Sequence, residues 1–436
     1  MASLRLESGS DHANSLCLRY EKGERSLVAR ALFQAVSPVA QTPKVVIVVL
    51  NWNGWPDTVE CVESILRADY SNIQIVICDN GSGDGSAERL REWADGTLEV
   101  ESAVTEGGHR WAYRPVPKPL PYAQYTRALE NPRFGTHDPK LIFVRVEKNL
   151  GYAGGNNIGL EYALAQPDVD YVWILNNDTV VERDTLARMV ASAEGDSRIG
   201  VVGSTLLHYR SPHAVQALGG GRFSRFSGRD HQIGRGRRHH THATQAFDLE
   251  HVVGASMLVR TATIREVGLI EESYFLYREE TDWCIQMRQR NWRLRYCPGA
   301  VVWHKEGRSI GHKSYLHDYY SVRNMLFLMQ KFYPKNLPLA ILFLASIAIP
   351  PKVCRLQFKR LKYVLKAFSD FFRGIQGSGD MLPDFDALAI ELASRTSQHE
   401  MKIGLREKLA GAELRKIKRG QAGAADTLEP TSDTAP

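Results

Sequence analysis

The feature that most constrains the fold of this chain is a series of short apolar runs that each end in a polar cluster. Lys44–Leu50 reads KVVIVVL and Ile73–Cys78 reads IQIVIC. Runs that are apolar at every position, rather than at alternate ones, are typical of strands buried on both faces. Between these two runs, Pro56 opens a pattern of helical period. Further strands are predicted at 141–146, 171–175 and 200–203. This alternation of strand and helix predicts an open, mostly parallel α/β sheet flanked by helices.

Polar clusters follow three of the predicted strands. The first strand ends in Asn51-Trp52-Asn53-Gly54, the second in the segment 79–86 (DNGSGDGS), and the fourth in Asn176-Asn177-Asp178. Asn, Gly and Asp taken singly are ordinary turn residues. The carboxyl ends of neighbouring parallel strands meet at one edge of a sheet, which is where open α/β sheets bind ligands. Three such clusters therefore predict a ligand crevice.

A dinucleotide fold is the obvious alternative, but the glycine loops do not match it. Neither DNGSGDGS nor GYAGGNNIG fits the register G-x-G-x-x-G. Asp79 and Asp84 would repel a bare diphosphate at a helix N-terminus, although they suit hydrogen bonds to a base or ribose. The phosphates would then need a cation, and Asp178 offers an oxygen ligand for Mg²⁺ or Mn²⁺. A nucleoside diphosphate with a metal ion is the better interpretation, and a dinucleotide-dependent oxidoreductase stays as an alternative.

The motifs also resemble a known family. VVIVVLNWNG, IVICDNGSGDGS, NLGYAGGNNIG and WILNNDTVV, in this order, are similar to the inverting family 2 glycosyltransferases of GT-A fold. The segment 252–309, which contains SYFLYREETDWCIQMRQRNWRLRYCPGAVVWHKEGRS, resembles their rhamnosyltransferase-like branch, and the similarity covers roughly 44–330. The resemblance implies a Rossmann-like sheet of GT-A type. It also implies metal-dependent transfer of a sugar from a nucleotide-diphosphate sugar, with dTDP-rhamnose as the first candidate donor.

The resemblance assigns roles to the polar clusters. Asn51 and Asp79 fall on positions that contact the nucleoside, and Gly155 and Asn156 on the loop beside the nucleotide and sugar. Asn176 and Asp178 occupy the positions of the D-x-D motif. The first Asp of that motif is Asn here, which leaves Asp178 as the main metal ligand. His304 falls where the family approaches the diphosphate or its metal, although a lone His beside Trp is often structural.

A group of acidic residues follows, at Glu279, Glu280 and Asp282. Inversion at an anomeric carbon requires a carboxylate within reach of the acceptor hydroxyl. The resemblance places this catalytic base at Glu280, where Asp is more usual, with Glu279 and Asp282 as alternatives. An acidic first turn of a helix would explain the same residues structurally. Trp283 is a candidate for stacking on an acceptor sugar, with core packing as its alternative. Arg308 and Ser309 are assigned to a loop that closes over the donor.

The positive charge of the chain is concentrated near its C-terminal part. The net charge is +6, and residues 352–373 contain seven Lys or Arg against one Asp. At helical spacing, residues 352–372 place their apolar and basic side chains on opposite arcs, which predicts an amphipathic helix on an anionic membrane surface. A helix packed on the catalytic domain is the alternative. The apolar run 337–351 is interrupted by prolines, so we expect it to be too short to span a membrane.

These observations define four regions and their partners. We expect an N-terminal extension at 1–43, a catalytic domain at 44–315 with an insertion at 97–139, a helical, membrane-associating region at 316–419, and a disordered tail at 420–436. The expected partners are a nucleotide-diphosphate sugar, a glycan or lipid-linked acceptor, and the membrane. No nucleic-acid module surrounds the basic loop 219–242, which we expect to be flexible and near the acceptor.

Cellular location is predicted from what the sequence lacks. Six scattered cysteines without a CxxC pair, and no apolar leader, indicate a cytoplasmic protein, peripheral on the inner face of the cytoplasmic membrane. A catalytically inactive nucleotide-sugar-binding protein at the membrane stays as a further alternative.

Overall fold

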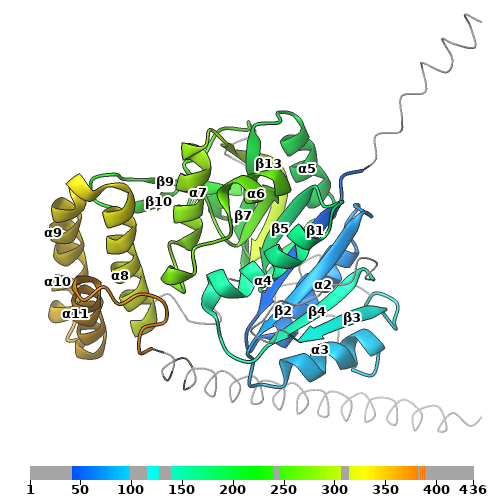
Figure 1. The fold of residues 1–436 in the computed structure, drawn as a ribbon, viewed down its shortest axis with the longest axis horizontal. Helices are drawn as coiled ribbons and strands as arrows, with labels where there is room; N and C mark the ends of the chain where they lie inside the picture. The colour runs from blue at the N-terminus through cyan, green and yellow to red at the C-terminus, as the bar shows by residue number, and fades with distance from the viewer. Residues whose placement is uncertain are drawn as a thin grey trace, which may run out of the picture. The chain divides into compact units, whose positions relative to one another are not determined.

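A computed structural model describes residues 42–98, 115–126, 139–239, 245–305 and 314–381, together with Pro383, Phe385 and Ala387 (Figure 1). Most of the predicted extension and insertion, the loop with Arg308 and Ser309, and the predicted tail lie outside these residues. The chain divides into two units at Thr42, and everything below concerns the second, Pro43–Pro436.

A ten-stranded sheet forms the centre of the part of the chain that the structure describes. The strands in spatial order are β3 (Tyr122–Thr126), β4 (Leu141–Val146), β2 (Ile73–Asn80), β1 (Val45–Asn51), β5 (Tyr171–Asn176), β12 (Ser256–Arg260), β7 (Ile199–His208), β13 (Arg293–His304) and β6 (Thr179–Val181), with β8 (Ser211–Leu218) paired to β7. β3 to β5 are parallel, β12 is antiparallel to both its neighbours, and β13 is parallel to β7. The predicted mostly parallel α/β sheet is confirmed.

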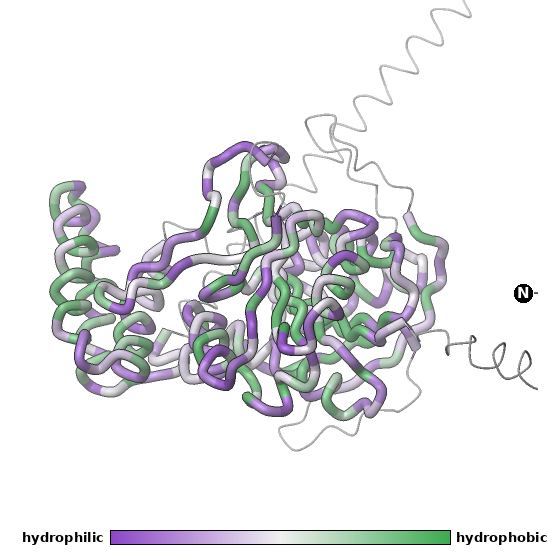
Figure 2. Tube along the Cα trace, turned by 90° about the horizontal axis from the view of Figure 1, so that it is seen from above, coloured by the Kyte–Doolittle hydropathy of each residue, from purple (hydrophilic) through white to green (hydrophobic). Residues whose placement is uncertain are grey.

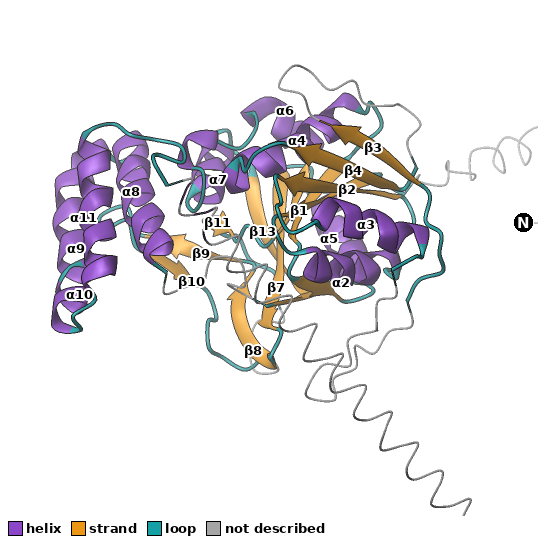
Figure 3. Cartoon of the chain, turned by 90° about the horizontal axis from the view of Figure 1, so that it is seen from below, coloured by secondary structure: helices purple, strands orange, loops and turns teal. Residues whose placement is uncertain are grey.

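Helices cover both faces of the sheet, as Figure 3 shows from below. Val45, Ile47 and Val49 of β1 pack into one core with α2 (Trp55–Leu66), α3 (Ser86–Asp95) and α5 (Thr185–Glu194). Val46 and Val48 pack into the opposite core with α4 (Gly151–Ala165), α6 (Thr261–Val267) and α7 (Glu279–Gln289). Every residue of β1 from Val45 to Val49 is fully buried, as its continuous apolar run predicts.

A small second sheet occupies part of the basic loop that we expected to be flexible. β9 (Gly220–Phe223) pairs with both β10 (Asp230–Gln232) and β11 (His251–Val252). A Cβ on Gly220 would stand 1.8 Å from the carbonyl oxygen of His251, so only glycine allows the strands to come this close. Glycine is rare in strands, so the sequence did not predict β9. Here the same glycines allow β9 to pair with its neighbours.

The C-terminal helices do not form the single amphipathic helix predicted at 352–372. They are α8 (Tyr315–Phe332), α9 (Leu337–Ala348), α10 (Pro350–Cys354) and α11 (Phe358–Phe372). Leu356 adopts a φ of 52° between α10 and α11, which ends one helix before the next begins. Val364 and Phe371, which we placed on the membrane-facing arc, are buried in a third core with α8. The alternative of packing onto the rest of the chain is therefore correct for that side of α11.

The prolines of the apolar run do not interrupt it as we expected. Pro338 lies in the first turn of α9 and Pro350 opens α10, positions where a missing amide proton costs little. By length and composition alone, Pro334–Cys354 could cross a membrane, and 17% of its most apolar window is buried.

Close packing of α4 against β1 fixes the distance between helix and sheet. A Cβ on Gly159 would lie 2.4 Å from a methyl carbon of Val48, and a Cβ on Gly155 would lie 2.4 Å from a methyl carbon of Leu50. Val48 itself is held between its sheet neighbours, so it cannot move aside.

We therefore predict that Gly159→Ala lowers the free energy of unfolding by roughly 1–3 kcal/mol, because the added methyl overpacks the interface. Gly83→Ala is the matched control, since a Cβ there meets no atom within 4 Å. Urea denaturation of both variants checks this. Equal stability of the two would contradict the proposed constraint.

Candidate active site

A cavity of about 310 Å³ opens at the carboxyl edge of the sheet, where the polar clusters were predicted to meet. The lining comes from the strand ends, the first turn of α4, the small sheet and the start of α7. It includes Trp52, Asn80, Asn149, Gly151, Tyr152, Asn176, Asn177, Asp178, Gln216, Gln232, Phe275, Leu276, Tyr277, Glu279, Glu280, His304 and Phe385. Five of the predicted site residues are thus brought together: Asn176, Asp178, Glu279, Glu280 and His304.

The carboxylate of Asp178 and the imidazole of His304 are in contact in this cavity. The end of β13 places His304 Nε2 3.1 Å from Asp178 Oδ1, while His304 Nδ1 lies 2.9 Å from Gln216 Oε1. Burial alone would raise the pKa of Asp178, but the charge and contact of His304, and the charge of Lys305, outweigh it and lower the pKa. Asp178 is therefore ionised at neutral pH. The backbone amide of Lys305 also donates to the Asp178 carbonyl at 2.9 Å, which ties the two segments together.

The donor set is suited to a divalent cation. Among the described residues, no three His, Cys, Asp or Glu side chains gather around one point. Asp178 and His304 would supply one carboxylate oxygen and one imidazole nitrogen to such an ion, and both line the cavity. Mg²⁺ is usually held by one or two carboxylates together with water and substrate phosphates. An open two-residue site therefore fits this class of ion.

Asn51 and Asp79 are neighbours in register at the ends of β1 and β2. Asn51 is fully buried; its Nδ2 donates to Asp79 Oδ1 at 2.8 Å and its Oδ1 accepts from Thr58 at 2.8 Å. Both ends of its amide are thus occupied, and it does not line the cavity. Asn51 holds Asp79 in place, and its expected contact with a nucleoside stays a prediction.

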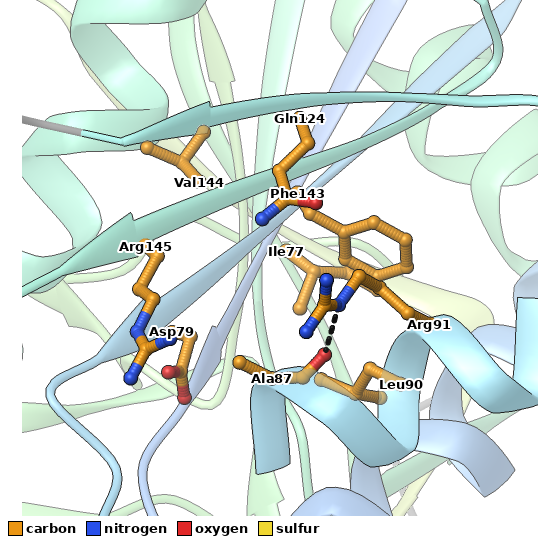
Figure 4. Close-up of a pocket in the computed structure, with 9 residues that line it drawn as sticks. All are labelled: Ile77, Asp79, Ala87, Leu90, Arg91, Gln124, Phe143, Val144 and Arg145. Carbon is orange, nitrogen blue, oxygen red and sulfur yellow. Dashed lines mark hydrogen bonds between the residues drawn. The ribbon is translucent and has the colours of Figure 1, made fainter. Parts of the chain in front are cut away.

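Asp79 lines a separate small hollow between β2, β4 and α3, shown in Figure 4. Its Oδ2 is buried and accepts no hydrogen bond from the described residues. Burial raises the pKa of Asp79, and the hydrogen bonds from Ser82 and Asn51 oppose that rise. Because this buried oxygen, beside Arg145, has no donor, it can accept a hydrogen bond from a ligand.

Gly155 and Asn156 lie one turn inside α4 rather than at the cavity. Gly155 packs on Leu50 and Asn80, and Asn156 is fully buried with its Nδ2 donating to the Tyr152 carbonyl at 2.9 Å. The structure therefore does not place these two residues in the cavity lining, and their expected contact with the nucleotide stays a prediction. Gly151 and Tyr152, in the first turn, line the cavity instead.

Asn80 and Asn177 were not singled out from the sequence, although both stand in the predicted clusters. Asn80 Nδ2 donates to Gly151 O at 3.0 Å, and its Oδ1 accepts from Leu150 N at 3.0 Å, which fixes the start of α4 on β2. Asn177 Nδ2 donates to Thr58 Oγ1 at 3.0 Å. Each side-chain amide thus holds a neighbouring segment in place. Both residues stand directly at a strand end, and this position could have identified them from the sequence.

Glu279 and Glu280 begin α7 and face the cavity. Burial raises the pKa of Glu279 well above its usual range, and the neighbouring charge of Glu280 raises it further. Burial also raises the pKa of Glu280, but the charge of Arg278 acts against that rise. The Oε2 atom of each is buried and accepts no hydrogen bond within the described part of the chain. Both carboxyl groups are therefore more readily protonated than an ordinary glutamate, and the charge of Arg278 opposes this at each of them.

Asp282 and Trp283 point away from the cavity. Asp282 is fully buried; its Oδ2 accepts from Tyr274 at 2.8 Å and from Lys331 of α8 at 2.7 Å. Trp283 is also fully buried and donates from Nε1 to the Gly268 carbonyl at 2.9 Å. The structure therefore places neither side chain at the cavity: Asp282 is held by Tyr274 and Lys331, and Trp283 packs in the core, which was the alternative expected for it. Both lie on faces of α7 that the helical turn directs into the protein.

The loop before α7 is held in a strained conformation. Phe275, Tyr277 and Arg278 have φ values of 64°, 68° and 81°, a region that costs an L-residue roughly 1–2 kcal/mol. Asn324 of α8 is fully buried, and its Nδ2 lies 2.8, 2.7 and 3.0 Å from the carbonyl oxygens of residues 274, 276 and 277. Arg323 donates from Nε to Asn324 Oδ1 at 3.0 Å, which fixes the direction of that amide. α8 thus sets the loop that presents the two glutamates.

A charged group lies behind Glu280. Arg278 Nη1 donates to Asp230 Oδ2 at 3.3 Å, and His251 Nε2 lies 3.1 Å from Asp230 Oδ1. Burial alone would raise the pKa of Asp230, but His251 and Arg278 lower it to about 2. The small sheet, which supplies Asp230 and His251, therefore contributes to the charge around the candidate base.

Comparison with known proteins finds one similar family. Residues 45–113 and 123–251 match the family model "Glycosyl transferase family 2". The match covers a little under half of the chain. This match, together with the sheet, confirms the expected fold of GT-A type. The rhamnosyltransferase branch is not decided by the match.

Individual relatives are distant. The low-salt glycan biosynthesis hexosyltransferase Agl10 of Haloferax volcanii is 22% identical over 252 residues, which cover 55% of this chain and 77% of the relative. Among solved structures, the mannosyltransferase PcManGT from Pyrobaculum calidifontis, in complex with GDP-Man and Mn²⁺, aligns with a TM-score of 0.43, 15% identity, and 80% and 94% of the two chains. S. aureus TarS 1-349 in complex with UDP-GlcNAc aligns with a TM-score of 0.44, 12% identity, and 83% and 92% of the two chains.

The contacts of Asn324 lead to a prediction about stability. Asn324→Leu keeps the side-chain volume but removes the side-chain donor of the Leu276 and Tyr277 carbonyls, so we expect the free energy of unfolding to fall by about 2–4 kcal/mol. Asn336→Leu is the control, because Asn336 makes one exposed hydrogen bond, to the Arg225 carbonyl. Urea denaturation compares the two, and a loss below about 1 kcal/mol at position 324 would contradict a restraining role.

Proposed function

We propose that this protein is an inverting, metal-dependent glycosyltransferase that uses a nucleotide-diphosphate sugar. The observation that supports the proposal most is the cavity in which an ionised Asp178 beside His304 faces a buried pair of glutamates. One side of such a cavity suits a diphosphate and its cation, and the other suits a hydroxyl that must lose a proton. The family 2 match and the similarity to a hexosyltransferase support the same activity.

The proposed reaction is a direct displacement at the anomeric carbon. Glu280 accepts the proton of the acceptor hydroxyl while that oxygen bonds to the anomeric carbon, and the bond from this carbon to the diphosphate oxygen breaks. The electron pair leaves with the nucleoside diphosphate, and the configuration of the carbon inverts. Glu280 is the proposed base because, after burial, the charge of Arg278 is the largest influence on its pKa, whereas burial and the charge of Glu280 both raise the pKa of Glu279.

Asp178 and His304 are the residues that we propose hold Mg²⁺ or Mn²⁺, with Asn176 beside them. A bound divalent cation would neutralise charge that develops on the departing diphosphate. Asp79, with its unused oxygen, is the proposed nucleoside contact, and Asn51 keeps it in place. The role of Asn80 is to hold the first turn of α4, where Gly151 and Tyr152 meet the donor.

The identities of donor and acceptor are finer proposals. We propose a deoxysugar on dTDP, rhamnose first, as the donor, and a glycan or lipid-linked glycan as the acceptor. The cavity wall made by Trp52, Phe275, Tyr277 and Phe385 suits the apolar face of a sugar. We also propose a cytoplasmic location at the inner face of the cytoplasmic membrane. The catalytic unit would extend past the predicted boundary at 315, because α8 holds the loop before α7.

The assignment of base and metal ligand predicts the activity of two variants. Glu280→Gln removes the proton acceptor and should lower kcat by 10²–10⁴-fold. Asp178→Asn should raise the Mn²⁺ concentration needed for half-maximal activity by about tenfold or more. Turnover of nucleotide sugars is the measurement, with Glu266→Gln as the control because Glu266 is exposed on α6. Full activity of both variants would exclude the assigned site, and donor binding without turnover by the wild type would favour an inactive binding protein.

The raised pKa of Glu280 predicts the pH dependence. Glu280 must be deprotonated to act, so kcat/KM should fall as the pH drops through its raised pKa, above the usual glutamate value of about 4.3. Arg278→Gln removes the charge that opposes this rise and should move the midpoint to higher pH. Arg278→Lys keeps the charge and serves as the control. A midpoint that is the same in all three proteins would show that Glu280 is not the titrating group.

A further inference from the structure

Most of the large apolar side chains that are exposed in the described part of the chain belong to its C-terminal helices. Eight of them belong to α9, α10, α11 or the turn between α10 and α11: Leu339, Leu342, Ile347, Val353, Leu356, Phe358, Leu365 and Phe372. The ninth, Phe226, stands at the tip of the β9–β10 hairpin, where the neighbouring Arg225 carbonyl accepts from Asn336 at the start of α9. We call these nine residues the apolar platform. Exposed apolar patches of this size mark interaction sites.

Most of the apolar platform lies on the outer side of α9 to α11. The inner side of α9 and α11 is buried against α8. Ala340, Leu344 and Ala348 of α9, and Val364, Ala367 and Phe371 of α11, are buried in the core that α8 shares. The outward stripe of α11 is Phe358, Lys362, Leu365, Ser369 and Phe372, all exposed at helical spacing. Figures 1 and 3 both show α8 between α7 and the layer of α9 to α11, and Figure 2 colours much of that layer hydrophobic. The exposed fractions reach 71% at Leu356 and 68% at Leu342 and Phe372.

The charge around the platform is positive and almost without acids. From Tyr333 to Arg373 the sequence contains one acidic residue, Asp370, which is buried and accepts from Tyr319 and Lys366. Lys352 and Arg360 pair with Asp318, so part of the basic arc is neutralised internally. Arg355 and Lys362 remain exposed and form no ion pair with any described residue, and Arg225 and Arg229 flank Phe226. Exposed apolar side chains among unpaired cations complement anionic lipid.

We propose that the apolar platform binds an anionic bilayer from one side, with α9 and α11 lying in the headgroup region and not crossing it. By length and composition Pro334–Cys354 could cross a membrane, so the packing of α9 decides between the two arrangements. A crossing would strip Ala340, Leu344 and Ala348 from the core that they share with α8. The proposal deepens the location given above but does not depend on catalysis, because it concerns a surface away from the cavity.

Flotation of the full-length protein with phosphatidylcholine vesicles, with and without phosphatidylglycerol, tests the proposal. We expect the wild type to float with the anionic vesicles and to bind the neutral ones more weakly. Leu342→Ser/Leu356→Ser/Phe358→Ser should lower the affinity at least about tenfold, since each side chain would otherwise be buried in lipid. Arg355→Glu/Lys362→Glu should lower affinity for anionic vesicles by about tenfold or more.

Arg183→Glu/Arg198→Glu is the matched control, because it makes the same change of net charge at exposed positions outside the C-terminal helices. Circular dichroism melting verifies that all variants are folded. The proposal is overturned if the wild type does not float, or if the apolar variant floats as well as the wild type. A dimer in sedimentation that the apolar variant dissociates, without vesicle binding, would instead assign the platform to a second copy of the chain. Donor turnover by the same preparations separates this result from a failure of the proposed activity.

Discussion

The burial of β1 on both faces is the constraint on which the rest of the structure depends. Val45 to Val49 alternate between two separate cores, so neither face of the central strand can carry a polar function. Polar side chains can appear only where the strands end, and Asn51, Asp79 and Asn176 are the residues at those ends. Gly155 and Gly159 bring α4 against the same strand, which sets where its first turn, with Gly151 and Tyr152, meets the cavity. The location of the site thus follows from packing.

Once the edge of the sheet is fixed, the opposite wall of the cavity needs a separate support. The loop before α7 has three non-glycine residues at positive φ, a conformation that persists only where the surroundings determine it. Asn324, Arg323 and the amide of Tyr152 supply that support, from α8 and from α4. Because α8 also carries α9 and α11, the helices beyond residue 315 belong to the same folded unit as the glutamates. A bilayer at the apolar platform would therefore be linked to the cavity through one helix.

The sequence predicted the sheet and the edge that carries the site, because continuous apolar runs and the residues after them report directly on burial and strand ends. Glu279, Glu280, Asp178 and His304 line the cavity, and their roles there stay predictions. The sequence could not show which residues are held away from the cavity by neighbours from distant segments. Asp282 is satisfied by Tyr274 and Lys331, and Trp283 by the Gly268 carbonyl, and no local pattern encodes those partners. The strained loop and its link to Asn324, 47 residues away from Tyr277, were likewise beyond reach of any short motif.

The basic C-terminal segment shows why a charge count needs the fold to be interpreted. Residues 352–373 contain a surplus equal to the net charge of the whole chain, which appeared to identify one basic face. In the structure, Asp318 of α8 pairs with Lys352 and Arg360, which ties α10 and α11 to α8. Asp370 pairs with Lys366 and Arg373 within the C-terminal segment itself. The buried side of α11 is the one that looked most apolar in sequence. What remains outside is a different set, with Leu342, Leu356, Phe358 and Phe372 as its apolar part and Arg355 and Lys362 as its charge. Substitutions of these exposed residues should therefore change the affinity for membranes. Substitutions of Val364, Phe371 and Lys366 should instead change the stability of the fold.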